Sequence, residues 1–300
     1  VTQAMEQVQI QAQMPDREIL SVIPRSFTLD AQTGLRSPQG MSGNHLIAHV
    51  HVITGATYVI QNLKKCLKLA NLEAAVLVPS ALAVSQLVLA DERELGVCIA
   101  DIGMGTTDIM VISEGTLIWM QVVPMGGELL THDLAVALKT PLRDAEHLKV
   151  QYGYAHATFA PRDETARVKK IADRPAEDIR LQQLTAFVQP RIEEIAEIIG
   201  ERLRLSGRFE KASTGIVLCG GTAALPGISQ VFESVLQCPC RVLKRAHQDG
   251  LDGLLQDPAN TVVAGLLAYG RDQEVLPQPH WLGAQGSIFN RVRQWIQGNF

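Results

Sequence analysis

The amino-acid sequence predicts an α/β protein that combines apolar strands with amphipathic helices. Three short apolar runs follow one another through tight turns, at residues 97–102, 109–112 and 116–123. Further along, segments with helical periodicity surround another apolar run, residues 215–218, which a Gly-Gly pair follows. Short apolar runs bounded by turn signals are typical of buried strands. We therefore expect strands and helices to share one mixed architecture.

Composition limits the class of protein. The chain has 300 residues, of which 46% are hydrophobic and 19% charged. A chain of this length suits two domains of common size and can form a substantial core without disulfides. The formal net charge of −4 argues against nucleic-acid binding, which usually requires a concentrated basic face. No apolar run approaches the roughly 18 residues of a membrane-spanning helix.

The cysteines favour a reducing compartment, of which the cytoplasm is the simplest. The chain has five, an odd number, and none forms a CxxC pair. Cys98 and Cys219 lie in apolar runs, where cysteine behaves as a small hydrophobic residue. Cys238 and Cys240 flank a proline, but two thiols without further ligands nearby do not predict a metal site.

The N-terminal part combines helices and strands in a compact α+β unit. Gly, Pro and Ser between residues 32 and 43 predict a loop. Strands are expected at 18–29, 45–54 and 74–78, and helices at 1–13, 57–72 and 80–90. In the helix at 57–72, one side carries Val59, Leu63, Cys66 and Leu67.

The strand at 45–54 carries three histidines at odd positions, His45, His49 and His51. Three imidazoles on one strand face could bind a metal. We favour the solvent-facing side of a half-buried sheet, because no carboxylate or cysteine accompanies them nearby.

A turn rich in Gly and Thr joins the first two apolar runs and reads Asp101-Ile-Gly-Met-Gly-Thr-Thr-Asp108. In such a turn, main-chain N–H groups and hydroxyls can converge on a phosphate. Asp101 lies at the mouth of its strand, where a carboxylate can hold a metal-bound water. Many turns of this kind only reverse the chain, so the turn alone is weak support for a ligand site.

Three further elements are candidates for ligand contact. Gly220 and Gly221 follow an apolar run and permit close approach of a flat ligand. Glu146 and Lys149 are three residues apart on a predicted helix and face the same way, as an exposed ion pair also would. Gly126 and Gly127 lie between a strand and a helix and form a weaker candidate.

A long helix is predicted at 189–205, with Pro190 in its first turn, where proline is tolerated. The last fourteen residues form a second strongly amphipathic segment. On a helix, one arc holds Ile288, Phe289, Val292, Trp295, Ile296 and Phe300, while Arg291 and Arg293 lie on the polar side. Such a helix suits a membrane interface, and the competing interpretation is an amphipathic helix docked on its own domain.

Taken together and in this order, these elements resemble the actin/Hsp70/sugar-kinase ATPase superfamily, and within it the FtsA family of bacterial cell-division proteins. The resemblance covers essentially the whole chain. The stretches that carry it are Met41-Ser-Gly43, Asp91 to Gly96, Asp101 to Asp108, Pro141 to Gly153, Gly215 to Gly227 and Gly265 to Gly270.

The resemblance implies an actin-like (ribonuclease-H-like) α/β fold with an FtsA-type 1C subdomain. We expect subdomain 1C at 1–69, a remnant of subdomain 1A at 70–95, the first part of 2A at 96–125, 2B at 126–213, the second part of 2A at 214–256, a connecting helix at 257–271, a linker at 272–286 and a membrane-targeting helix at 287–300. The family begins with further residues that carry a first phosphate loop, and nothing here matches them. We therefore expect an N-terminally truncated chain that binds nucleotide weakly or not at all.

The resemblance also implies the ligands. The cofactors would be ATP and Mg²⁺, held by Asp101, Gly103, Gly105, Thr106, Thr107, Gly126, Gly127, Glu146, Lys149, Gly220, Gly221 and Thr222. Glu146 and Lys149 would contact ribose and adenine. The family usually has glycine where this chain has Met104, which would alter the approach to the γ-phosphate.

The implied function is an ATP-binding cell-division adaptor at the septum, on the cytoplasmic face of the inner membrane. It would not be an enzyme, and a weak ATPase is expected only of the full-length protein. Its partners would be the C-terminal peptide of FtsZ, other division proteins, a second copy in a head-to-tail polymer and an anionic membrane. Arg191 is our choice of FtsZ contact. A pilus-assembly actin-like protein and a small-molecule kinase remain the alternatives, since fold alone decides none of these.

Overall fold

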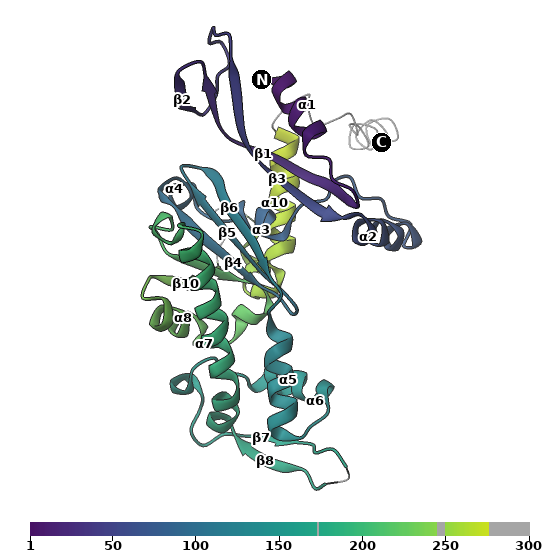
Figure 1. The fold of residues 1–300 in the computed structure, drawn as a ribbon. Coiled ribbons are helices and arrows are strands. Elements are labelled where there is room, and N and C mark those ends of the chain that lie inside the picture. Colours follow the sequence, from purple (N-terminus) through teal and green to yellow (C-terminus); the bar gives the residue numbers. More distant parts are fainter. Residues whose placement is uncertain (173, 245–249, 276–300) are drawn as a thin grey trace. The chain divides into compact units, whose positions relative to one another are not determined.

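The computed structural model describes residues 1–172, 174–244 and 250–275, which form two compact units (Figure 1). Unit 1 holds Val1–Pro79 and the described residues from Gly270 onward. Unit 2 holds Ser80–Tyr269. Both units combine strands and helices, which confirms the predicted α/β class.

Unit 1 is built on an antiparallel sheet with the strand order β2-β1-β3. Its elements are α1 (Thr2–Gln11), β1 (Arg17–Leu29), β2 (Gln32–Leu35), β3 (Leu46–Ala56) and α2 (Thr57–Leu69). The predicted strands at 18–29 and 45–54 are confirmed. The predicted loop differs, because its first residues pair with the end of β1 and place Leu35 opposite Phe27.

The histidines of β3 do not gather around a metal site. His49 is exposed, and its Nε2 lies 3.4 Å from the hydroxyl of Thr28 on β1. His51 is half-buried and lies opposite Ile23. Among the residues that the structure describes, no group of three His, Cys, Asp or Glu side chains could hold a metal ion.

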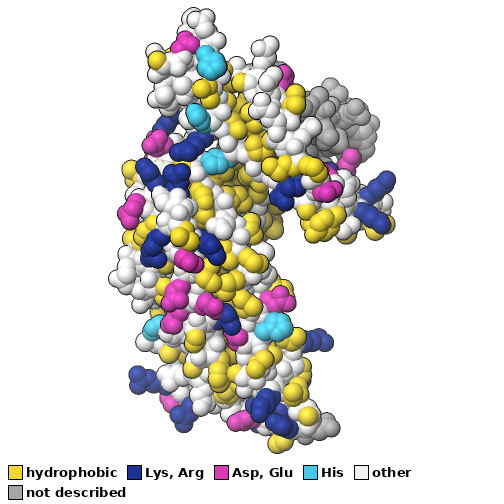
Figure 2. Space-filling model, viewed as in Figure 1, with side chains coloured by type: hydrophobic (Ala, Val, Ile, Leu, Met, Phe, Trp, Pro, Cys, Tyr) yellow, Lys and Arg dark blue, Asp and Glu magenta, His cyan; other side chains and the backbone are white. Residues whose placement is uncertain are grey.

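The apolar side of α2 is largely exposed. Val59 and Leu63 retain 51% and 48% of their accessible surface, and only Ile60 of this helix is buried. Hydrophobic side chains accordingly appear beside basic ones on α2 in Figure 2. The strand expected at 74–78 is also absent, and Val76 is 59% exposed. An apolar run becomes a strand only beside a pairing partner, and no described strand lies alongside it.

Unit 2 contains a mixed five-stranded sheet with the order β10-β9-β4-β5-β6. The strands are β4 (Val97–Ile102), β5 (Thr107–Ser113), β6 (Thr116–Val123), β9 (Ile216–Cys219) and β10 (Cys240–Val242). β4, β5 and β6 are the three predicted strands and pair in an antiparallel meander, whereas β9 runs parallel to both β4 and β10. The loop after β4, with the Gly/Thr turn, and the loop after β9, with Gly220 and Gly221, therefore leave the same edge of the sheet.

Helices cover both faces of this sheet (Figure 1). Alternate residues of β4, including Cys98 and Ala100, belong to a core that also holds residues of α7 (Leu181–Leu205) and α8 (Ile228–Leu236). On the other face lies α3 (Ser80–Ser85). Helix α10 (Thr261–Val275) packs so closely against α3 that a Cβ on Gly265 would meet the main chain of Ala83 at 2.5 Å. The predicted helix at 80–90 is wrong in its extent, because α3 ends at Ser85. A separate helix, α4 (Ala90–Leu95), begins after a short turn, and the carboxylate of Glu92 accepts the N–H of Leu89 at its start.

The remainder of unit 2 is a helical lobe with a small hairpin. It consists of α5 (Gly127–Leu138), α6 (Leu142–Tyr152), the hairpin of β7 (Thr165–Val168) and β8 (Glu177–Arg180), and the first half of α7. Short helical turns lie at Ala157–Phe159, Phe209–Lys211, Gly221–Ala224 and Pro258–Asn260, and α9 at Asp252–Leu255.

Helix α7 begins before the residue that the sequence predicted. Leu184 and Val188 are buried and continue the apolar face of Ile192 and Ile195 toward the N-terminus. Pro190 therefore lies inside the helix and not in its first turn. Burial of that face outweighs the loss of one helical hydrogen bond at proline.

Candidate functional site

The turn between β4 and β5 is a tight hairpin. Ile102 pairs with Thr107, and the N–H of Gly103 donates to the main-chain oxygen of Thr106 at 2.9 Å. Met104, Gly105 and Thr106 are exposed at its tip. Within the described chain, the main-chain N–H groups of these tip residues have no hydrogen-bond partner. The predicted phosphate hairpin thus presents a set of free donors.

Two other loops press against this hairpin through glycines. A Cβ on Gly126 would lie 2.5 Å from the main-chain oxygen of Met104. Gly220 has a φ of +83°, and a Cβ there would lie 2.5 Å from the Asp101 carboxylate. Only glycine allows such close approach of one backbone to another.

The three loops are joined at one oxygen atom. The main-chain oxygen of Gly103 accepts the N–H of Gly127 at 2.9 Å and the hydroxyl of Thr222 at 3.0 Å. Beside it, the N–H of Glu128 donates to Met104 at 2.8 Å. The first amides of α5 therefore bind the hairpin, and Thr222, which is buried, holds the loops together from the other side.

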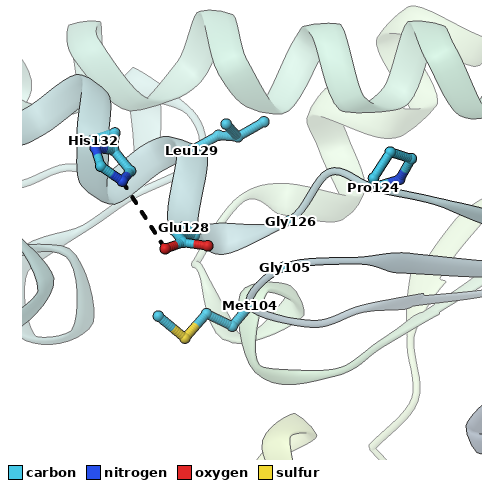
Figure 3. Close-up of a pocket in the computed structure, with 7 residues that line it drawn as sticks. All are labelled: Met104, Gly105, Pro124, Gly126, Glu128, Leu129 and His132. Atoms are coloured by element: carbon cyan, nitrogen blue, oxygen red, sulfur yellow. Dashed lines mark ion pairs between the residues drawn. The ribbon is translucent and has the colours of Figure 1, made fainter. Parts of the chain in front are cut away.

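A cavity of about 260 Å³ lies against the hairpin and the first turns of α5 (Figure 3). Met104 and Gly105 line it from the hairpin, and Glu128 and His132 from the helix. Glu128 and His132 approach one another to 4.0 Å as an i,i+4 pair. Met104 is 63% exposed, so it occupies the hairpin surface at the position where the resemblance led us to expect glycine.

Asp101 and Asp108 form a carboxylate pair beside the hairpin. They are directly opposite one another on β4 and β5, so their side chains share one face of the sheet. Burial and, secondarily, the charge of Asp108 raise the pKa of Asp101, and the nearby hydroxyl of Ser80 opposes this rise. The hydroxyl of Ser80, the first residue of α3, donates to Asp108.

Glu146 and Lys149 meet as their spacing predicted. Lys149 is buried, and its Nζ contacts Glu146 Oε2 at 2.6 Å. The same Nζ donates to the main-chain oxygen of Gly127 and to the hydroxyl of Thr131, both at 2.9 Å. Burial raises the pKa of Glu146, but the hydrogen bonds from Lys149 and Thr131 and the charge of Lys149 outweigh it and hold that pKa below its usual value.

These residues suit ATP with Mg²⁺. The free amides at the hairpin tip can bind phosphate oxygens, and Glu146, whose side chain is 40% exposed, can accept ligand hydroxyls. Mg²⁺ is commonly held by one or two carboxylates together with waters and phosphate oxygens, which Asp101 and Asp108 can support. A Cβ on Gly221 would meet only Ala259, at 3.8 Å, so this side of the third loop is open.

The other predicted contacts lie elsewhere. Arg191, on α7, forms a two-pronged ion pair with Asp133 of α5 at 2.7 and 3.0 Å and also pairs with Glu194. Its guanidinium therefore serves helix packing. The tail residues Ile288, Phe289, Arg291, Val292, Arg293, Trp295, Ile296 and Phe300 lie outside the described residues. Within the described part, the helices are too short or too polar to span a bilayer.

Comparison with known families settles the relationship. The family model "Cell division protein FtsA" matches residues 98–265, and "SHS2 domain inserted in FTSA" matches residues 1–54. The chain belongs to the FtsA family. It is 34% identical to the FtsA protein of Pseudomonas aeruginosa over 100% of this chain and 74% of that protein. The FtsA protein of Neisseria meningitidis serogroup B is 36% identical over 95% and 71%, and that of Escherichia coli K12 is 33% identical over 95% and 71%.

Solved structures show the same fold. The PilM–PilN type IV pilus biogenesis complex superposes with a TM-score of 0.62 at 16% identity, over 92% of this chain and 72% of that one. MreB5 of Spiroplasma citri bound to ADP gives 0.58 at 20% identity, over 73% and 66%. The chain thus has the predicted actin-like fold and is a cell-division protein of the FtsA family. At these identities the pilus protein shares the fold alone, so the pilus-assembly alternative is not favoured.

Sequence reasoning missed three residues of the site. Asp108 could have been found, since antiparallel pairing across the turn places it opposite Asp101. Thr131 and Ser80 gave no signal, because each reaches its partners only through contacts between separate elements.

Proposed function

We propose that the chain belongs to an actin-like cell-division adaptor whose intact form binds ATP with Mg²⁺. We further propose that it assembles at the septum and tethers the FtsZ ring to the cytoplasmic face of the inner membrane. The observation that carries the nucleotide proposal is the convergence of three loops on the main-chain oxygen of Gly103. The free hairpin amides, the Asp101–Asp108 pair and the half-buried Glu146 supply the groups that such a ligand needs.

In this proposal each element has a separate task. The amides of residues 104–106 bind phosphate oxygens, and Asp101 and Asp108 hold waters of the magnesium ion, which neutralises phosphate charge. Glu146 accepts hydroxyls of the ligand, and the open side of Gly221 receives its flat base. The likeness to MreB5 bound to ADP supports a nucleotide in this fold.

The bound nucleotide sets the conformation or polymer state of the protein and is not a substrate that is turned over for its products. The relatives carry the name of a division protein, which supports an adaptor. Any ATPase activity would then be weak.

Subdomain 2B, roughly residues 126–213, is proposed to bind the FtsZ peptide through cations on α7. Arg191 remains our choice, with Glu194 as the group that a peptide carboxylate would replace. Glu194 is 45% exposed and can leave, whereas the Asp133 pair holds the guanidinium in position. A few partly exposed charge contacts, at about 0.2–1 kcal/mol each, predict micromolar and salt-sensitive binding.

Self-association and membrane binding complete the proposal. A head-to-tail contact that involves residues 1–68 would build an open polymer. The segment 287–300 would lie in an anionic membrane surface with its arginines toward the headgroups.

Calorimetry of Mg-ATP binding to the intact protein tests the nucleotide proposal. We expect binding that Asp101→Ala weakens in a magnesium-dependent manner. If Asp101→Ala bound ATP as tightly as the wild type, both with and without magnesium, the assignment of the site would be refuted.

A further inference from the structure

The hydroxyl of Thr131 lies at the centre of the Glu146–Lys149 pair. Thr131 is on the second turn of α5 and is 5% exposed. Its Oγ1 contacts Glu146 Oε2, accepts from Lys149 Nζ at 2.9 Å and lies 3.1 Å from the main-chain oxygen of Gly127. One hydroxyl therefore connects both members of the pair to α5.

Lys149 has no proton left for a ligand. An ammonium group carries three donors, and here they go to Gly127, Thr131 and Glu146. A ligand that used Lys149 would have to break one of these buried hydrogen bonds, which is costly for a buried charge. Lys149 thus orients its neighbours and does not contact the ligand through Nζ.

The two carboxylate oxygens of Glu146 have different surroundings: the protein binds one, and the other is free to face solvent. Both Thr131 and Lys149 hold the same oxygen, Oε2. The other oxygen, Oε1, has no hydrogen-bond partner among the described residues, and the side chain is 40% exposed. A carboxylate oxygen accepts hydrogen bonds and donates none, so Oε1 suits a ligand hydroxyl.

We propose that Thr131 is a positioning residue that determines which carboxylate oxygen of Glu146 faces the ligand, and so sets recognition of the ligand's hydroxyl groups. This inference rests on the proposed nucleotide function. Lys149 alone, on the same helix as Glu146, would leave the carboxylate free to rotate about its axis. A second hydrogen bond from a different helix, α5, removes that freedom.

The test compares Thr131→Val with Thr131→Ser in the intact protein. Valine keeps the shape of threonine but loses the hydroxyl, whereas serine keeps the hydroxyl. Affinities are measured for ATP, 2′-deoxy-ATP and 3′-deoxy-ATP, with a thermal melt of each variant. We expect Thr131→Val to weaken ATP binding about 10-fold and to abolish the preference of the wild type for ATP over at least one deoxynucleotide, and Thr131→Ser to retain both.

Equal loss of affinity for all three nucleotides in Thr131→Val, or no loss, would overturn the inference and leave the nucleotide proposal standing. If serine behaved like valine, the hydroxyl would not be the cause, and the inference would also fail. A wild-type protein that bound none of the three nucleotides would instead refute the nucleotide function, and this inference with it.

Discussion

The hydroxyl of Thr222 donates to the main-chain oxygen of Gly103 at 3.0 Å, which ties the loop after β9 to the hairpin between β4 and β5. The same oxygen accepts the N–H of Gly127. Parallel pairing of β9 with β4 brings the two loops to one edge of the sheet, and the hydrogen bond then fixes their separation. The shape of the candidate site therefore depends on Thr222 as a strut, in addition to any ligand contact that it makes.

Thr222→Val should weaken nucleotide binding and lower stability by about 1 kcal/mol, because a buried hydrogen bond is lost. The loss of stability should be at the low end of the range for a buried hydrogen bond, because the main-chain oxygen of Gly103 still accepts the N–H of Gly127. Thermal melts and nucleotide titration measure the two effects. Thr222→Ser keeps the hydroxyl and should behave like the wild type, and a serine variant as impaired as the valine variant would contradict this role.

Gly221→Val should block the ligand without harming the fold. A Cβ at this position meets only Ala259, at 3.8 Å, so the melting temperature should be close to that of the wild type while ATP binding is lost. Gly220→Val is the matched control. Its positive φ and the contact with Asp101 predict a protein that fails to fold stably. Nucleotide binding by Gly221→Val at wild-type affinity would show that the ligand does not approach this loop.

Asp101→Asn should stabilise the protein at neutral pH while it weakens magnesium-dependent binding. The pKa of Asp101 is raised in the folded state, mainly by burial, so the folded protein binds its proton more tightly than the unfolded chain. Stability from this group is therefore present at low pH and is lost as pH rises from the unfolded pKa through the folded pKa. Above that window the ionised form opposes folding, and asparagine removes this penalty.

Thermal melts of wild type and Asp101→Asn across pH check this sign. The two curves should converge at acidic pH and separate toward neutral pH, with the variant more stable. A variant that is less stable at pH 7 would indicate that asparagine loses more in hydrogen bonding than it gains in charge.

Arg191 can be tested apart from its packing role. Arg191→Gln and Asp133→Asn both break the same ion pair, which is partly exposed and should contribute no more than about 1 kcal/mol. Only the first removes the cation. We expect Arg191→Gln to weaken binding of the FtsZ C-terminal peptide strongly at low salt, and Asp133→Asn, which loosens the guanidinium but keeps its charge, to weaken it less. Equal affinities for the two variants in fluorescence anisotropy would exclude Arg191 as a peptide contact.

The C-terminal segment should hold the protein on anionic vesicles. Trp295→Glu places a charge within the predicted apolar arc, where burial of such a side chain contributes about 1.5–3 kcal/mol at most. Gln294→Glu adds the same charge on the polar side and serves as its control. Trp295→Glu should no longer co-sediment with anionic vesicles, whereas the control Gln294→Glu should. Binding of the FtsZ peptide should be unchanged in both variants. If Trp295→Glu instead lowered the melting temperature and left vesicle binding intact, the helix would dock on its own domain.

Local patterns predicted much of the site. Two apolar runs around a Gly/Thr turn indicated the hairpin at Asp101 to Asp108, and spacing alone placed Glu146 and Lys149 on one side of α6. These features depend on residues close together in sequence, whose geometry is set by helical period and turn chemistry. Local patterns placed the start of α7 wrongly. Pro190 suggested that the helix begins at residue 189, but burial of Leu184 and Val188 extends it toward the N-terminus.

The sequence by itself determined the α/β class, the order of most elements and the stretches that place the chain in the FtsA family. Tertiary structure alone decided the partners across elements: Thr222 on Gly103, Thr131 on Glu146, Ser80 on Asp108 and Arg191 on Asp133. It also decided that the apolar run at 74–78 forms no strand within the described chain. A turn or a helical face is encoded by neighbours in sequence, whereas a hydrogen bond or a strand pair needs a second group that only the folded chain brings within reach.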